Sequence, residues 1–233
     1  MKIKIEIWDK KTIKLYGVDK LKKELVEHVK KSWCDPGHMA DDWVSKSDVL
    51  VTCRSASHEI IGFATGVFID KKTLNLNATI LNKEYQNQGI ANKLNLRIVG
   101  SFLKHNPKAF LSGFYIVVRT PNPILYESLV RKIGFYPDYR RHRPPMPWEA
   151  EAIKRFAGFS KDIKYDEEKF IVCGILKNYP GFIYETKDIP WSKNEMANKF
   201  IESRINLERR EGNMIVLVAR INIISLLMTI LSI

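Results

Sequence analysis

Cysteine is scarce in this sequence: the 233 residues include three, Cys34, Cys53 and Cys173, which lie far apart along the chain. An odd number of widely spaced cysteines argues against a disulfide framework and predicts reduced thiols in a reducing compartment. The segment CDPGH places Cys34 near His38, the one pair that hints at a metal. Because a zinc site needs a second pair within reach, we interpret this pair as structural and expect no metal.

Acidic residues are outnumbered. Lysine and arginine total 38 against 26 aspartates and glutamates, which gives a formal net charge of +12 and a pI near 9.5. Such a charge favours anionic partners: a phosphorylated cofactor, nucleic acid or a membrane surface. The lysines are spread along the whole chain, as on an ordinary solvated surface, and YRRHR at 139–143 is the one dense basic segment. Charge alone therefore gives little support to nucleic acid as a partner.

Long hydrophobic runs are missing from most of the chain. The N-terminal segment MKIKIEIWDKK alternates apolar and charged residues and lacks the apolar core of a signal peptide, so we expect no export and a cytoplasmic protein. The exception is 214–233, which is long enough to span a membrane but carries Arg220 and Asn222 near its middle. Its β-branched residues favour a buried strand over 214–221, then an apolar tail over 222–233 that packs on the domain or a partner. Membrane contact through that tail is the less favoured alternative.

The periodicity of apolar residues predicts the secondary structure. In the first half of the chain, the pattern predicts a strand at 2–8, an amphipathic helix at 18–33 and a loop-like segment with a possible helical turn at 34–47. Three strands joined by hairpins are expected at 48–54, 59–70 and 73–81. In the second half, the pattern predicts helices at 90–103, 123–133 and 189–212 and a short helix at 148–157. Strands are expected at 114–119, 134–140 and 169–176. In the last helix Ser192 is the expected N-cap and Gly212 the expected end.

The stretch YQNQGIANKL at 85–94 interrupts this pattern between a strand and a helix. A helix start offers unpaired backbone N–H groups and a partial positive charge, so such a turn can hold a phosphate group without charged side chains. Gly89 allows a ligand to approach the backbone closely, and Ala91 keeps the surface small. Taken alone, the stretch is also compatible with a plain connector.

Two other phosphate-binding loops are excluded by their context. A Rossmann glycine turn follows a parallel strand near the start of its domain, whereas three hairpin-linked strands precede this one. A Walker loop ends in Gly-Lys-Ser/Thr, and the sequence has no such ending.

With its neighbours, the stretch resembles the acyl-CoA motif of the GCN5-related N-acetyltransferase (GNAT) family. Residues 86–91 match the family pattern Q/R-x-x-G-x-G/A, and LVRKIGF at 129–135 resembles a later family helix that ends in Gly-Phe. The resemblance covers roughly 2–140 and implies an α/β (α+β) fold, with a mixed, mostly antiparallel central sheet flanked by helices. We accordingly expect a GNAT core with the acyl-CoA site over 1–140, and an extension over 141–221 whose helix and final strands complete the sheet.

The resemblance also implies that acetyl-CoA is the co-substrate. Backbone amides of the motif would hold its pyrophosphate, and the end of the preceding strand, around Leu81, would bind its pantetheine arm like an added strand. Asn122 resembles a cofactor-contacting asparagine of the family, offset by one residue, and would alternatively be a simple helix cap. The implied cofactor-binding residues are Leu81, Gln86, Asn87, Gln88, Gly89, Ile90, Ala91, Asn92 and Asn122.

The reaction needs a neutral amine, a polarised carbonyl and a proton for the leaving thiolate. Many family members supply this proton from a tyrosine four residues before the glycine of the Gly-Phe pair, but this chain has Val130 there. Tyr126, one helical turn earlier on the same face, is the candidate acid and could equally pack in the core. Glu84 and Glu59 are candidate bases by position only, and a solvated face or a water relay are the alternatives.

We therefore expect an N-acetyltransferase that moves an acetyl group from acetyl-CoA to a primary amine of a protein, peptide or small molecule. The alternative is a non-catalytic module of this fold that binds CoA or nucleic acid, which Val130 keeps open. The resemblance implies that 33–47 and 139–190 select the acceptor. The second segment is rich in aromatic residues and proline, and it suits a lid or a homodimer contact better than base stacking. The sequence does not name the acceptor.

Overall fold

Residues 3–141, 143–159 and 164–222 are described by the computed structural model, and they fall into two units. Unit 1 ends at Ser112 and unit 2 begins at Gly113. This division lies inside the 1–140 segment that we expected from the sequence to form the core. Strand β5 (Phe114–Thr120) and helix α6 (Pro123–Ile133) therefore belong to the second unit.

Unit 1 contains a four-stranded sheet in which consecutive strands pair antiparallel. The strands are β1 (Lys4–Asp9), β2 (Val49–Arg54), β3 (Ile60–Asp70) and β4 (Thr73–Leu81), and they lie in this order. The register places Ile7 opposite Val51, and Val51 opposite Ala64. Alternation of side chains across the pleat therefore carries odd-numbered residues of β1 and β2 to one face and even-numbered residues to the other.

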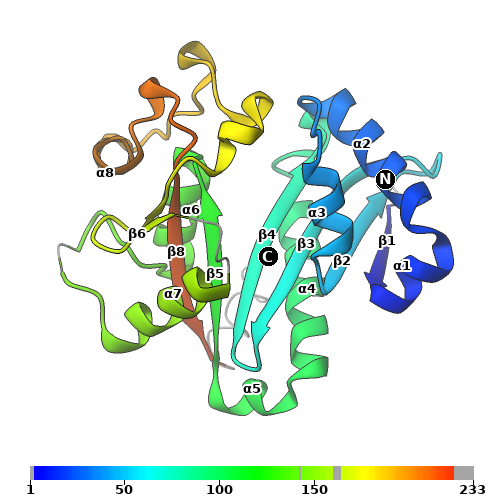
Figure 1. Ribbon diagram of the computed structural model, residues 1–233, viewed down its shortest axis with the longest axis horizontal. Helices are drawn as coiled ribbons and strands as arrows, with labels where there is room; N and C mark the ends of the chain where they lie inside the picture. Colours follow the sequence, from blue (N-terminus) through cyan, green and yellow to red (C-terminus); the bar gives the residue numbers. More distant parts are fainter. Residues whose placement is uncertain (1–2, 142, 160–163, 223–233) are drawn as a thin grey trace. The chain divides into compact units, whose positions relative to one another are not determined.

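Helices cover both faces of the unit 1 sheet (Figure 1). The helices are α1 (Lys10–Tyr16), α2 (Val18–Ser32), α3 (Met39–Ser45), α4 (Ile90–His105) and α5 (Pro107–Ser112), with a 3-10 turn, η1, at Lys83–Tyr85. Helix α2 turns fully buried residues toward the core, and its His28 ring lies 5.8 Å from Phe63 of β3. Helix α4 packs on the opposite face, where a Cβ on Gly66 would collide with Ile98.

The strands of unit 2 pair antiparallel in the order β5, β8, β7, β6. Strand β8 (Met214–Ile221) is the longest of these, and β7 (Ile171–Val172) and β6 (Tyr165–Asp166) are only two residues each. Helices α6 and α8 (Glu195–Ile205) pack together through stacked Tyr126 and Phe200 rings, 5.4 Å apart. Helix α7 (Pro147–Phe159) packs on β5 through Trp148, stacked on Tyr115 at 5.7 Å. The remaining 3-10 turns are η2 (Ile175–Asn178), η3 (Pro180–Phe182), η4 (Thr186–Asp188) and η5 (Leu207–Arg209).

The expected mostly antiparallel sheet flanked by helices is confirmed, as is the last strand, which spans 214–221 as predicted. Three predicted elements are wrong in extent. The strand expected from 134 is a single bridge between Tyr136 and Val218, because Pro137 has no N–H to continue the ladder. The strand expected over 169–176 stops at Val172, because Gly174 turns the chain at φ +65.

The predicted helix over 189–212 is the third such element. It is shorter at both ends, because Asn194 and not Ser192 caps it and Asn206 ends it in the left-handed region. Helices α1 and α5 were not predicted at all. Both are about two turns or less and bury one residue each, Ile13 and Ala109, so they have almost no periodic signal.

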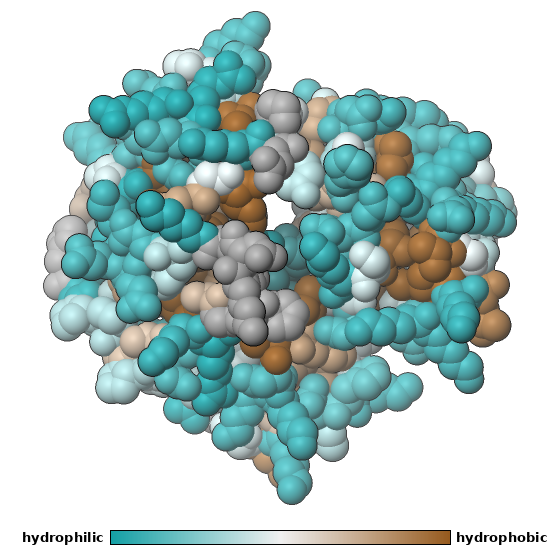
Figure 2. Space-filling view, viewed as in Figure 1, coloured by the Kyte–Doolittle hydropathy of each residue, from teal (hydrophilic) through white to brown (hydrophobic). Residues whose placement is uncertain are grey.

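Polar residues are spread over the surface, as the even distribution of lysines along the sequence predicts. Figure 2 shows hydrophilic residues over most of the viewed face of each unit. Among the described residues, no helix is both long and apolar enough to cross a membrane. The tail expected at 222–233 lies, beyond Asn222, outside the described residues.

Candidate functional site

Helix α4 starts from a turn whose backbone is partly left-handed. The η1 turn follows the end of β4, and Asn87 and Gly89 then take positive φ values of 61° and 73°. A Cβ added to Gly89 would meet no atom of the described residues within 4 Å, so none of these residues fills the space next to Gly89. Gln86, Asn87 and Gln88 are exposed, whereas Ile90 is buried and anchors the first turn of the helix in the core.

The first backbone amides of α4 have no partner inside the helix. Its first helical hydrogen bond runs from the Lys93 N–H to the Gly89 carbonyl at 3.2 Å, so the N–H groups of Ile90, Ala91 and Asn92 precede it. No side chain caps this end, and its first turn has no acidic residue. The positive end of the helix dipole is therefore open to an anion.

This open start differs from the other long helices. Helix α6 is capped by Asn122 and helix α8 by Asn194. Helices α2 and α7 carry Asp19 and Glu149 in their first turns. Among the described helices of more than two turns, α4 alone has neither a side-chain cap nor an acid there, so its start is the place in these helices where a ligand would complete the helix.

Two glutamine side chains form hydrogen bonds with backbone carbonyls of the turn and of the strand before it. The Gln86 Nε2 atom donates to the Leu81 carbonyl at 3.2 Å, and the Gln88 Nε2 atom donates to the Glu84 carbonyl at 2.9 Å. The first bond ties the turn to the end of β4, where the Asn82 N–H also donates to Ile61 at 3.0 Å. The Gln86 N–H itself donates to the Lys83 carbonyl at 3.2 Å. The turn is thus held in one conformation, and its open amides begin after Gln86.

The residues expected to bind the cofactor in unit 1 are therefore brought together. Gln86 through Asn92 form one continuous turn and helix start, and Leu81 joins it through its carbonyl. The geometry fits a pyrophosphate, since a pocket of backbone donors with no side chain over Gly89 is what a close-approaching phosphate requires.

Asn122 lies in unit 2 and caps α6. Its side-chain oxygen accepts from the Leu125 N–H at 3.1 Å, and its side chain also forms a hydrogen bond with Tyr184. Burial raises the pKa of the Tyr184 phenol to about 12, so it is protonated at neutral pH. Tyr184 was not singled out from the sequence, because it follows a run of 3-10 turns without periodicity. The one feature of the sequence that could have drawn attention to Tyr184 was its place in the aromatic-rich segment 139–190.

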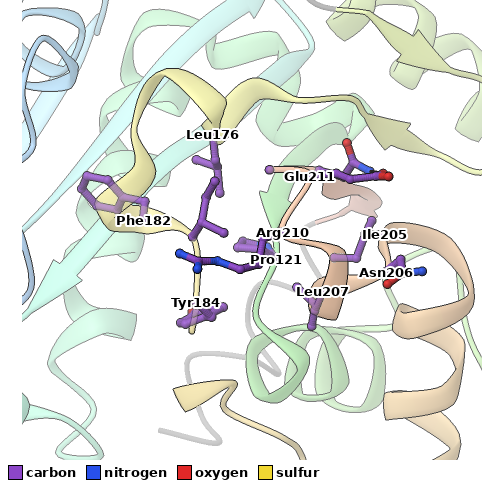
Figure 3. Close-up of a pocket in the computed structure, with 12 residues that line it drawn as sticks. Pro121, Leu176, Phe182, Tyr184, Ile205, Asn206, Leu207, Arg210 and Glu211 are labelled. Carbon is purple, nitrogen blue, oxygen red and sulfur yellow. Dashed lines mark hydrogen bonds between the residues drawn. The ribbon is translucent and has the colours of Figure 1, made fainter. Parts of the chain in front are cut away.

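Tyr184 lines a pocket of unit 2 that Figure 3 shows in close-up. Apolar walls come from Leu176, Phe182 and Leu207, and Arg210 lies at the same pocket. Arg210 is paired with Glu185, at 2.8 Å between Nη2 and Oε1. The pocket therefore combines a neutral phenol, an apolar lining and an already neutralised cation.

Tyr126, the candidate acid, is fully buried. Its hydroxyl donates to the Pro137 carbonyl at 3.1 Å and accepts from the Tyr139 N–H at 3.1 Å. Burial raises the pKa of this phenol far above its usual value. With both hydrogen bonds spent on the chain that follows α6, the structure favours the packing interpretation of Tyr126. Val130, at the family's usual tyrosine position, is also fully buried.

The two candidate bases are exposed. Glu84 lies in η1, and Glu59 pairs with Lys31 at 3.6 Å on the surface of unit 1. Nothing in their surroundings distinguishes them from solvated carboxylates, and Glu84 stays a prediction.

The three arginines of the basic segment 139–143 pair with two nearby acids. Arg140 and Arg141 share Asp138, at 2.9 and 3.7 Å, and Arg143 forms a two-pronged pair with the buried Glu149. The Arg143 pair ties the proline-rich turn to the start of α7, and the three arginines with their two acids keep one net positive charge. Among the described residues, no group of three or more metal-ligand side chains comes together.

Comparison with known proteins gives likenesses of structure and none of sequence. No protein-family model matches the sequence, and no curated protein matches it. Among solved structures, an IAA acetyltransferase from Bacillus cereus ATCC 14579 is 15% identical with a TM-score of 0.49, and the match covers 94% of this chain and 100% of that one. A GNAT family acetyltransferase from Elizabethkingia anophelis, solved with acetyl-CoA bound, is 15% identical with a TM-score of 0.43 and coverages of 94% and 98%.

A third match is shorter. A protein of Deinococcus radiodurans R1 assigned as an acetyltransferase is 16% identical with a TM-score of 0.33, and the match spans 43% of this chain and 65% of that one. The chain is similar in fold to GNAT-family acetyltransferases. At these identities and scores the likeness does not extend to the reaction or the substrate, which have to be inferred from the chain's own residues.

Proposed function

We propose that the chain is an acyltransferase that binds acetyl-CoA through the start of α4 and transfers its acetyl group to a primary amine. The observation that carries this proposal is the open first turn of α4, in which Gly89 leaves space and three successive N–H groups have no cap or first-turn acid among the described residues. Anions are favoured at such a helix start by both the dipole and the free donors.

The residues proposed to hold the cofactor are the backbone amides of Ile90, Ala91 and Asn92, for the pyrophosphate, with Gly89 giving access. Leu81, at the end of β4, is the proposed contact for the pantetheine arm, and Gln86 fixes its position. Acetyl-CoA supplies the acetyl group as a thioester, whose transfer leaves a thiolate that needs a proton.

Tyr126, the acid expected from the sequence, has its hydroxyl committed to two backbone groups of unit 2. We therefore expect Tyr126→Phe to act mainly on stability and to change kcat little.

Calorimetry tests the cofactor site directly. Acetyl-CoA and S-acetylpantetheine, which lacks both the pyrophosphate and the 3′-phosphoadenosine, are titrated into the protein. We expect acetyl-CoA to bind at least tenfold more tightly, which corresponds to about 1.4 kcal/mol for the whole phosphate-bearing nucleotide part. Absence of acetyl-CoA binding at high micromolar concentration contradicts the proposal.

Thiol release then separates an enzyme from a binding module. Acetyl-CoA is incubated with the protein and a panel of peptides, polyamines and aminoglycosides, and free CoA is measured. Release that depends on the amine supports transfer. Tight acetyl-CoA binding with no release across the panel favours the non-catalytic alternative, for which the buried valine at position 130 is the supporting observation.

A further inference from the structure

A groove in unit 1 runs beside the second half of helix α4. Its floor is formed by Ile7 of β1 and Val49 of β2, and its wall by Leu96 and Gly100 of α4. The polar residues at its margins are Asp9, Asp48, Arg97, Ser101, Lys104 and His105. Its volume, about 380 Å³, lies within the range of small-molecule sites, roughly 300–1,000 Å³.

The floor is accessible because no described helix packs over Ile7. Helix α4 packs on β2, β3 and β4, and the odd-numbered face of the edge strand β1 is left beside it (Figure 1). Ile7 is consequently 46% exposed, although its neighbour across the strands, Val51, is fully buried. On the other face of β1, by contrast, the Trp8 ring packs against Tyr16 at 4.8 Å.

Gly100 is a second feature of the groove that indicates a bound ligand. A glycine within a helix costs about 1 kcal/mol relative to alanine. The glycines of β3 have a packing reason, since a Cβ at Gly62 would collide with Leu81 and one at Gly66 with Ile98. A Cβ at Gly100 would meet no atom within 4 Å. No described residue of unit 1 therefore requires a glycine there, whereas a ligand that approaches the helix backbone along the groove does.

The charges around the groove select the sign of that ligand. Both carboxylate oxygens of Asp48 are engaged, one by Lys10 at 2.8 Å and the other by the Phe68 N–H at 2.7 Å. Asp9 is occupied as the N-cap of α1. Arg97 and Lys104, seven residues apart on one side of α4, form no ion pair with a described residue. Lys10 thus offsets the charge of Asp48, and the two positive charges of Arg97 and Lys104 exceed the single negative charge of Asp9.

We propose that this groove binds a small anionic molecule with an apolar body, of the class of an alkyl or aryl carboxylate. Its carboxylate pairs with Arg97 and Lys104, and its apolar part lies on Ile7 and Val49 and passes over Gly100. Gly100 follows Asn92 by eight residues, about 12 Å along the helix axis. The groove is therefore a site separate from the start of α4, and the inference does not depend on the proposed function.

The experiment uses the full-length protein with octanoate as the probe and octylamine, its cationic counterpart, as the charge control. Methyl-labelled NMR follows the signals of Ile7 and Leu96 during each titration. We expect octanoate to shift both signals in a saturable way at millimolar concentration or below, and octylamine to leave them unchanged. No saturable shift, or equal shifts with both probes, overturns the proposal.

Two variants locate the binding. Gly100→Leu fills the groove and, as a helix-favouring change at an exposed position, should keep or raise the thermal midpoint. Arg97→Gln with Lys104→Gln removes the two cations. We expect each variant to weaken octanoate binding at least tenfold and to leave acetyl-CoA affinity unchanged. Unchanged octanoate binding in Gly100→Leu contradicts the proposal. A folded Gly100→Leu that turns a dimer into a monomer by light scattering also overturns it, because a second copy would then be the occupant.

Discussion

Helices α4 and α6 each follow a strand in their own unit, yet their first turns are completed in different ways. In α6, Asn122 caps the helix and Pro123 occupies the first position, where its missing N–H costs nothing. In α4, Gly89 turns the chain and the following N–H groups have neither a cap nor an acid. The difference shows that the local sequence decides whether the first N–H groups of a helix are capped by a side chain or left without a cap.

The largest expected effect comes from adding an acid to the open start. Asn92→Glu places a carboxylate in the first turn of α4, where it should stabilise the helix by about 0.3–1 kcal/mol through the dipole. The same charge repels a pyrophosphate, so we expect acetyl-CoA affinity to fall at least tenfold while the thermal midpoint stays or rises. Calorimetry and thermal unfolding measure the two effects.

Leu125→Glu is the matched control, because Leu125 is 42% exposed and occupies the corresponding place in α6. It should add the same dipole stabilisation without lowering acetyl-CoA affinity by repulsion at the α4 turn. Equal losses of affinity in the two variants, or none in Asn92→Glu, would show that the start of α4 is not the anion site.

The second largest effect is a loss of stability when the buried hydrogen bonds of Tyr126, in α6, are removed. Tyr126→Phe removes the hydroxyl that bridges the Pro137 carbonyl and the Tyr139 N–H, and leaves both groups buried. We expect the free energy of unfolding to fall by about 1–3 kcal/mol, measured in urea. Tyr115→Phe, which keeps the ring stacked on Trp148, is the control for the same chemical change. A large loss of kcat with unchanged stability would instead return Tyr126 to the role of proton donor.

A smaller effect is expected at the cap of α6. Asn122→Ala should cost about 1 kcal/mol of stability, because the Leu125 N–H loses its partner. Asn122→Asp keeps an accepting oxygen and should retain most of that stability. If acetyl-CoA affinity falls in both variants, Asn122 contacts the cofactor in addition to capping; if stability is unchanged in Asn122→Ala, the cap is not what closes α6.

The smallest effect is the response to salt. An exposed anion site weakens as counterions screen it, so raising the ionic strength from about 0.05 to 0.25 M should reduce acetyl-CoA affinity by roughly two- to fivefold. The cap of α6 is a hydrogen bond between neutral groups and should not respond to salt. An affinity that is insensitive to salt would point to binding dominated by apolar contacts.

Much of unit 1 could be predicted because its elements are long and periodic. Strands β2, β3 and β4 alternate or are continuously apolar between clear turn signals, and α4 shows helical spacing immediately after the glycine turn. The place of the glycine-containing turn at 85–89 was predictable for the same reason, since it lies between a clear strand pattern and a clear helix pattern.

Unit 2 resisted prediction where its structure depends on distant partners. Strands β6 and β7 have two residues each, and they exist because β8 offers an edge to pair with. Tyr184 acquires its surroundings from Asn122, 62 positions earlier in the chain. Neither relation leaves a periodic trace in the sequence.

The open start of α4 also bears on how long the protein survives in a cell. An anion that binds there adds to the stability of the folded state by mass action, about 2.7 kcal/mol when its concentration is a hundred times its Kd. Proteases act on chains that open transiently, so a protein whose helix is completed by a metabolite is degraded faster when that metabolite runs short. Its abundance would then follow the supply of the ligand, with no change in transcription.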